Sequence, residues 1–114
     1  MHNRSFEEFW WQLQHRLRSA QDAPGGGIEV PNWTVLKGYL GDTMKVVAVR
    51  GETIEVVAPN AKNLVVVQKA HFRAVWEIWS LYKDGQVRRA EIDAMTHYSK
   101  YIISILHWME AEEI

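Results

Sequence analysis

The chain has 5 histidines and 14 aspartates and glutamates, the side chains that can exchange protons or bind metal ions. The candidate acids and bases are His15, His71, His97, His107, Glu91 and Asp93. Asp93 and His97 are four residues apart, a spacing that places two side chains on one face of a helix, where they can hold a metal ion or orient a base. A helix break expected near Thr96 disrupts this spacing, and the sequence offers no third ligand. We therefore expect a surface hydrogen bond at this position.

Motifs of known enzymes and metal proteins are also lacking. The chain has no cysteine, which excludes disulfides, thiolate metal sites and cysteine nucleophiles. No nucleophile elbow or zinc motif is found, and the glycines at 25–27 follow an expected helix, whereas a phosphate-binding loop follows a strand. We expect a protein without catalytic residues, metal ions or cofactors.

Residues 72–109 show the spacing of caps and apolar positions typical of three consecutive helices. The segment resembles a helix-turn-helix unit, and the resemblance is carried by Gly85, Val87, Arg89, Glu91, Ile92, Thr96, Ser99, Tyr101, Ile102, Ile105 and Leu106. In that family the later helix enters the major groove of DNA. The resemblance implies contacts to bases by Ser99, Lys100 and Ile103, and contacts to phosphates by Lys83, Arg88 and Arg89.

Two features of the same segment argue against a sequence-specific DNA reader. Its last helix has no Arg, Asn or Gln to make the usual contacts to guanine or adenine, and Glu110, Glu112 and Glu113 follow closely. The chain as a whole has a formal net charge of −1, which excludes binding of nucleic acid through bulk positive charge. Packing of three helices is the simpler interpretation, and DNA binding stays an alternative.

Aromatic side chains offer a third kind of site. An aromatic-lined pocket for an apolar or cationic small molecule would be formed by Trp33, Phe72, Trp76, Trp79, Tyr82 and Trp108. Aromatic residues at helical spacing more often fill a core. Tryptophan also anchors protein interfaces, for which the candidates are Trp10, Trp11, Trp76 and Trp108. Trp11 lies off the apolar stripe of its helix and is expected to be exposed.

The elements that position these side chains follow from local patterns. Ser5 and Glu8 have the spacing of a capping box, and the apolar period predicts a helix over residues 5–20. Pro24 and the glycines after it predict a flexible connector at 23–27. Strand signals cover residues 33–68, and the helical period returns at 69–110, with Gly85 ending the first helix there.

The hairpin around Gly51 and Glu52 has a register that the sequence can predict. Pairing Arg50 with Thr53 places Val47, Val49, Ile54 and Val56 on one face of the sheet, and charged or small side chains on the other. The opposite face also receives apolar side chains, namely Val46, Val57, Leu64 and Val66. We expect the first helix or a second subunit to cover part of that face.

The sequence thus predicts an α+β fold in a single domain, residues 1–114. An N-terminal helix precedes a three- or four-stranded antiparallel meander, and two long helices separated by a short helix pack on the sheet. No apolar run approaches the roughly 20 residues that span a bilayer, and no secretory signal is recognised, so we expect a cytoplasmic protein without membrane contact. Its general character is similar to that of small bacterial proteins encoded on mobile gene cassettes.

The apolar faces of the helices exceed what one small sheet can cover. We therefore expect a non-enzymatic interaction module that forms a homodimer. The alternative is a DNA-binding accessory or regulatory protein that uses the three C-terminal helices. The third possibility is a protein that binds a small molecule, of unknown identity, in the aromatic pocket.

Overall fold

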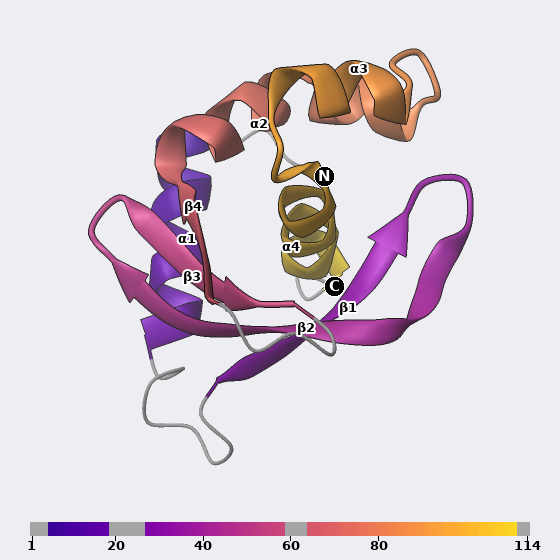
Figure 1. Ribbon diagram of the computed structural model, residues 1–114. Coiled ribbons are helices and arrows are strands. Elements are labelled where there is room, and N and C mark those ends of the chain that lie inside the picture. Colours follow the sequence, from indigo (N-terminus) through magenta and orange to yellow (C-terminus); the bar gives the residue numbers. More distant parts are fainter. Residues whose placement is uncertain (1–4, 19–26, 59–63, 112–114) are drawn as a thin grey trace.

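Helix α1, Phe6–Leu17, begins at the capping serine that the sequence predicts. A computed structural model describes residues 5–18, 27–58 and 64–111 of the chain (Figure 1). Ser5 Oγ accepts a hydrogen bond from the Glu8 amide at 3.2 Å, which satisfies one of the amides that a helix start leaves unpaired. The expected helix over 5–20 is confirmed as far as Leu17, and residues 19–20 lie outside the described part. So does the expected connector at 23–27, apart from Gly27.

Four strands form one antiparallel meander in the order β1-β2-β3-β4. They are β1, Ile28–Thr34; β2, Gly38–Arg50; β3, Thr53–Val57; and β4, Leu64–Gln68. The sheet begins at Ile28, before the expected start at residue 33. Val30 is fully buried in this first strand, and Pro31 is tolerated because β1 lies at an edge of the sheet.

The predicted pairing of Arg50 with Thr53 is confirmed, but the predicted faces are wrong in one place. The pairing of β2 with β3 is irregular between Val46 and Ala48, as at a β-bulge, where one extra residue enters a strand. Val46 therefore pairs with Val56, and both are fully buried in the core. The sequence pattern predicted Val46 on the opposite face of the sheet and Val47 on the face shared with Ile54 and Val56.

Three helices follow the sheet, as expected for residues 69–110. They are α2, Lys69–Lys83; α3, Arg89–Met95; and α4, Ser99–Ala111. Gly85, between α2 and α3, has a φ of 81°, a conformation that favours glycine. The helices lie on one side of the curved sheet, and α4, seen end-on, occupies the middle of the molecule (Figure 1). No helix in the described residues is long and apolar enough to cross a membrane.

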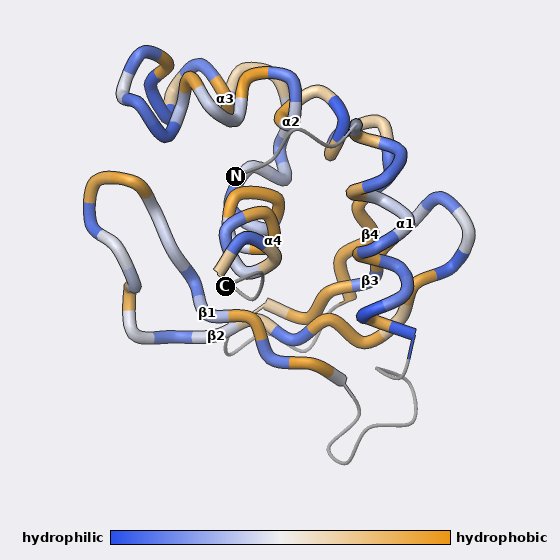
Figure 2. Tube along the Cα trace, turned by 180° about the vertical axis from the view of Figure 1, so that it is seen from behind, coloured by the Kyte–Doolittle hydropathy of each residue, from blue (hydrophilic) through white to orange (hydrophobic). Residues whose placement is uncertain are grey.

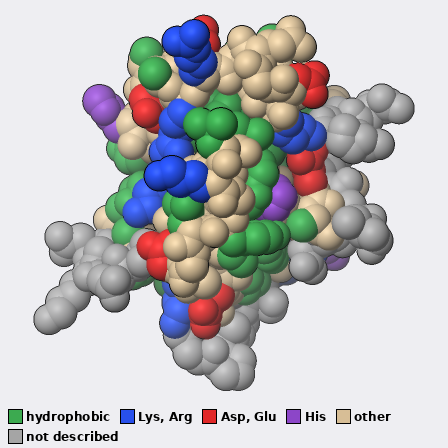
Figure 3. Space-filling model, turned by 90° about the vertical axis from the view of Figure 1, so that its right-hand side faces the viewer, with side chains coloured by type: hydrophobic (Ala, Val, Ile, Leu, Met, Phe, Trp, Pro, Cys, Tyr) green, Lys and Arg blue, Asp and Glu red, His purple; other side chains and the backbone are tan. Residues whose placement is uncertain are grey.

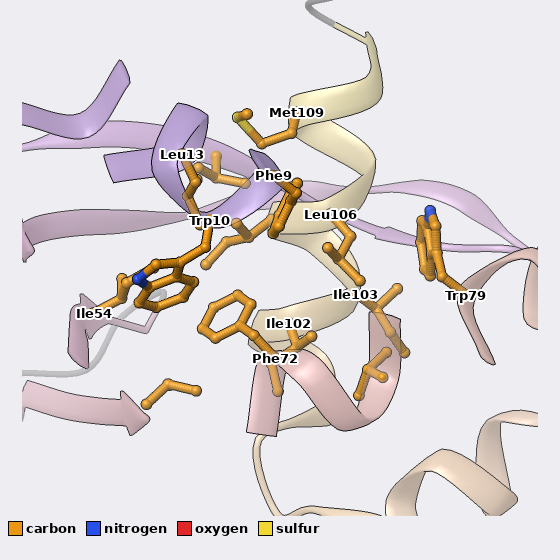
Figure 4. Close-up of a cluster of buried hydrophobic side chains, with 14 of the residues drawn as sticks. Phe9, Trp10, Leu13, Ile54, Phe72, Trp79, Ile102, Ile103, Leu106 and Met109 are labelled. Carbon is orange, nitrogen blue, oxygen red and sulfur yellow. The ribbon is translucent and has the colours of Figure 1, made fainter. Parts of the chain in front are cut away.

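The core lies between α1, α2, α4 and the inner face of the sheet. Figure 4 shows the aromatic side chains of α1 and α2 converging with apolar side chains of α4. The ring of Phe9 stacks on Trp76 at 4.6 Å between centroids, and Trp10 meets Phe72 edge-on at 5.5 Å. Contacts of this kind add to the stabilisation from burial itself. The α+β architecture expected from the sequence is therefore confirmed.

Polar side chains hold α4 and α2 against the outer edge of β1. The Trp33 amide donates to Ser104 Oγ at 3.0 Å, and the Ser104 hydroxyl donates to Asn32 Oδ1 at 3.1 Å. Val35 directly follows β1, and its amide donates to the Tyr82 hydroxyl at 3.2 Å. Side chains of the helices thus satisfy amides that an edge strand otherwise leaves free.

Candidate functional site

Asp93 and His97, the expected acid and base pair, lie on different elements. Asp93 is in α3, and His97 follows the end of that helix at Met95. The Asp93 carboxylate accepts hydrogen bonds from the Ser99 hydroxyl and from Arg89 Nε, the latter at 3.0 Å. The bond from Ser99 lowers the pKa of Asp93, and Arg89 lowers it further. Asp93 thus ties α3 to the start of α4. Within the described residues, no group of three or more acidic or histidine side chains is placed to hold a metal ion.

His107 packs closely against Trp33 and Tyr39. Its ring stacks on Trp33 at 3.9 Å, with an angle of 3° between planes, and its Nε2 lies 3.2 Å from the Tyr39 hydroxyl. Burial lowers the pKa of His107 below the ordinary value of 6.5; Lys83 acts in the same direction, and Glu110 opposes it. The folded protein therefore favours the neutral ring.

This preference makes stability depend on pH. Because the unfolded chain binds a proton at His107 more readily, the free energy of unfolding is expected to fall as the pH drops below about 6.5, and to level off below the folded pKa. The measurement is the melting temperature between pH 7.5 and pH 5. His107→Gln is expected to flatten this dependence, whereas His97→Gln, at an exposed position, serves as the control. Equal slopes for the two variants would contradict this account.

The residues proposed to contact DNA are divided between core and surface. Ile103 is fully buried in α4 and Ser99 is 6% exposed, so neither is placed to contact bases. The reason is the central position of α4, which packs against β1 on one side and α2 on another. Of the proposed phosphate contacts, Lys83 pairs with Glu110 at 2.8 Å and Arg89 with Asp93. DNA binding through the remaining cations, Arg88 and Lys100, stays a prediction.

The six aromatic residues expected around a pocket do not share one site. Phe72 and Trp79 fill the core. Trp76 is half-buried and stacks on Phe9. Trp33 stacks on His107, and the guanidinium of Arg16 lies 4.9 Å from the ring centroid of Trp108. Tyr82 does line a cavity, but together with aliphatic and cationic residues of the β1–β2 hairpin and the α2–α3 turn.

The expected interface tryptophans differ in exposure. Trp10 is buried in the core, and Trp76 and Trp108 are half-buried. Trp11 is 61% exposed, as expected from its position off the apolar stripe, and its ring stacks on His15. One turn earlier in α1, Glu7 binds Lys69 at 2.9 Å, and Lys69 directly follows β4. An exposed tryptophan therefore lies on the side of the molecule where β4 ends.

The free edge of β4 is a functional candidate that the sequence analysis did not single out. The Lys69 amide donates to the Glu52 carbonyl of the β2–β3 turn at 2.7 Å. Because backbone groups alternate in direction along a strand, Val65 and Val67 also face β3, whereas Leu64, Val66 and Gln68 direct their amides and carbonyls outward. Within the described residues, no strand pairs with this outer edge.

Two side chains on this edge are apolar and exposed. Leu64 and Val66 are 48% and 43% exposed, and Figure 2 shows β4 as mostly hydrophobic. The strand Leu64–Gln68 carries no charge, no proline and no glycine. Natural proteins usually protect an edge strand with such residues or cover it. β1 is protected in this way by Pro31 and by the hydroxyls of Ser104 and Tyr82, whereas in the described part of the chain β4 is the open edge. The absence of charge over residues 64–68 was the signal available in the sequence.

Comparisons with known protein families, with curated proteins and with solved structures gave no match to this chain. The helix-turn-helix resemblance and the likeness to proteins of mobile gene cassettes therefore stay predictions.

Proposed function

We propose that this protein is a non-enzymatic interaction module that forms a homodimer by pairing β4 with β4 of a second copy. The observation that carries the proposal is the open, uncharged edge of β4. Its outward backbone groups are ready to form an antiparallel ladder, in the way that strand addition joins proteins through exposed sheet edges.

The strand is complementary to itself under two-fold symmetry. An antiparallel pairing centred on Val66 places Val66 opposite its own copy and Leu64 opposite Gln68 of the partner subunit. The outward-facing residues Leu64, Val66 and Gln68 then form the hydrogen-bonded pairs, up to about six bonds in all. No charged side chain stands opposite another within this ladder, so like-charge repulsion is avoided. A two-fold axis of this kind is the commonest symmetry of soluble oligomers.

The pairing also buries apolar surface that the isolated chain exposes. Leu64 and Val66 lie on the outer face of the sheet, and Val65 and Val67 lie on the face that the helices cover, because alternate residues point to opposite faces. In the dimer, Val65 meets Val67 of the partner subunit on the inner side. The joined sheet is then continuous across the axis, and the open edges disappear. A five-residue ladder is a small interface, typical of a transient complex with a micromolar dissociation constant.

Sedimentation equilibrium of the wild-type chain tests the proposal. At about 100 µM, above the dissociation constant of a micromolar complex, we expect the mass of a dimer, with dissociation on dilution to about 1 µM. A monomer over this whole range would overturn the proposal. A dimer that persists when β4 is blocked would place the interface elsewhere.

A further inference from the structure

A cavity of about 510 Å³ lies between the turn of the β1–β2 hairpin and the turn that joins α2 to α3. In Figure 1 the hairpin rises beyond the rest of the sheet, on the side of the molecule away from β4. The hydrogen bond from the Val35 amide to the Tyr82 hydroxyl joins the two walls. This volume falls in the range of sites for small organic molecules.

The walls of the cavity are mainly apolar. The hairpin contributes Val35, Leu36 and Leu40, and the α2–α3 segment contributes Tyr82, Val87 and Ala90. Tyr82 is almost fully buried, whereas Leu36 is 91% exposed and Leu40 is 45% exposed. Exposed leucines at a hairpin tip lose contact with water when an apolar molecule enters beside them, which favours binding.

The charged residues that line the cavity are all cations. Lys37 comes from the hairpin, and Arg88 and Arg89 come from the start of α3; no carboxylate is among the lining residues. Arg89 is held by Asp93. Lys37 and Arg88 have no carboxylate within ion-pair distance among the described residues. On the face that carries the hairpin, hydrophobic side chains gather in the middle. Most of the Lys and Arg side chains lie to their left and above them, and Asp and Glu side chains lie on both sides (Figure 3).

We infer that this cavity binds a small molecule with an apolar body and a single carboxylate, such as a medium-chain fatty acid. The aliphatic walls and the Tyr82 ring take up the apolar body. Lys37 and Arg88 bind the carboxylate at the rim, where charge-assisted hydrogen bonds are stronger than neutral ones. A cationic ligand is disfavoured, because the charged residues that line the cavity, Lys37, Arg88 and Arg89, are all positive. The inference is independent of the dimer, since none of these residues belongs to β4.

Titration of the protein with decanoate, decan-1-ol and decylammonium, followed by backbone amide NMR, tests the inference. Decanoate is expected to bind about tenfold more tightly than decan-1-ol, and decylammonium more weakly than either. The shifts should concentrate on the amides of Leu36, Val87 and Ala90. Equal binding of decanoate and decan-1-ol, no binding of decanoate at about 1 mM, or shifts centred on Leu64 and Val66 would each overturn the inference.

Two double variants test whether Lys37 and Arg88 bind the carboxylate of decanoate. The double variant Lys37→Gln with Arg88→Gln is expected to reduce the affinity for decanoate about tenfold and to leave that for decan-1-ol unchanged. Arg73→Gln with Lys100→Gln removes the same charge outside the cavity lining and is expected to change neither affinity. Ala90→Trp, at an exposed position of α3, fills the space and should weaken both ligands. If the two double variants behave alike, the rim cations do not recognise the carboxylate.

Discussion

Replacement of Ser104 by alanine is expected to lower the free energy of unfolding by about 2–4 kcal/mol. Ser104 is fully buried, and its hydroxyl accepts from the Trp33 amide and donates to Asn32 Oδ1. Alanine lacks this hydroxyl, so the Trp33 amide and Asn32 Oδ1 of β1 each lose a hydrogen bond. Asn32 is itself 4% exposed, so water does not readily replace the lost hydroxyl.

Urea unfolding followed by tryptophan fluorescence measures this loss. The protein concentration is kept low, so that association does not contribute to the measured stability. Ser80→Ala is the matched control, because Ser80 is an exposed serine of α2, and its replacement should change stability by no more than about 0.5 kcal/mol. A similar small effect for both variants would show that Ser104 does not hold α4 to β1.

Replacement of Val66 by proline is expected to weaken the homodimer about 100-fold. Proline removes the central outward amide of β4, and its ring occupies the space in which the second copy pairs, a loss of about 3 kcal/mol. The fold of the subunit should survive, because the Val66 amide faces away from β3 and proline is tolerated at such edge positions. Sedimentation equilibrium at about 10 µM should therefore show mainly monomer for this variant and mainly dimer for the wild-type chain.

Two further variants test whether dissociation results from the loss of pairing between the two β4 strands. Val66→Thr keeps the amide and the branched side chain and should remain dimeric. Val66→Lys keeps the amide but places two like charges opposite each other at the two-fold axis, so it should dissociate even if the proline variant fails to fold. Dimers of unchanged stability in the lysine variant would contradict pairing through β4.

The helices and turns were predictable because their signals are local. Ser5 marks the start of α1, Gly85 ends α2 with a positive φ, and Gly51 with Glu52 fixes the hairpin register. Each of these depends on residues a few positions apart, which the sequence shows directly.

The features that sequence reasoning missed depend on contacts between distant segments. The bulge at Val46 is not visible in the alternation of β2, in which Val46 and Val47 are equally apolar. The helix-turn-helix resemblance implied a base contact by Ile103, yet Ile103 is fully buried, because α4 has neighbours on several sides. Ser104 is also fully buried, and its hydrogen bond to the Trp33 amide of β1 is not visible in the sequence. The cavity likewise joins two segments that are distant in the sequence, since Val35 and Tyr82, which are hydrogen-bonded across it, are 47 residues apart.

The central claim, antiparallel pairing of β4 centred on Val66, is tested most directly by single cysteines, since the chain has none of its own. In the proposed dimer the two Val66 Cα atoms are about 5.5 Å apart, within the range of a disulfide, whereas the two Leu64 Cα atoms are about 14 Å apart. Under mild oxidation we expect Val66→Cys to form a disulfide-linked dimer and Leu64→Cys, which is similarly exposed, to remain unlinked. Equal linkage of the two variants, or none at Val66→Cys, would contradict the account.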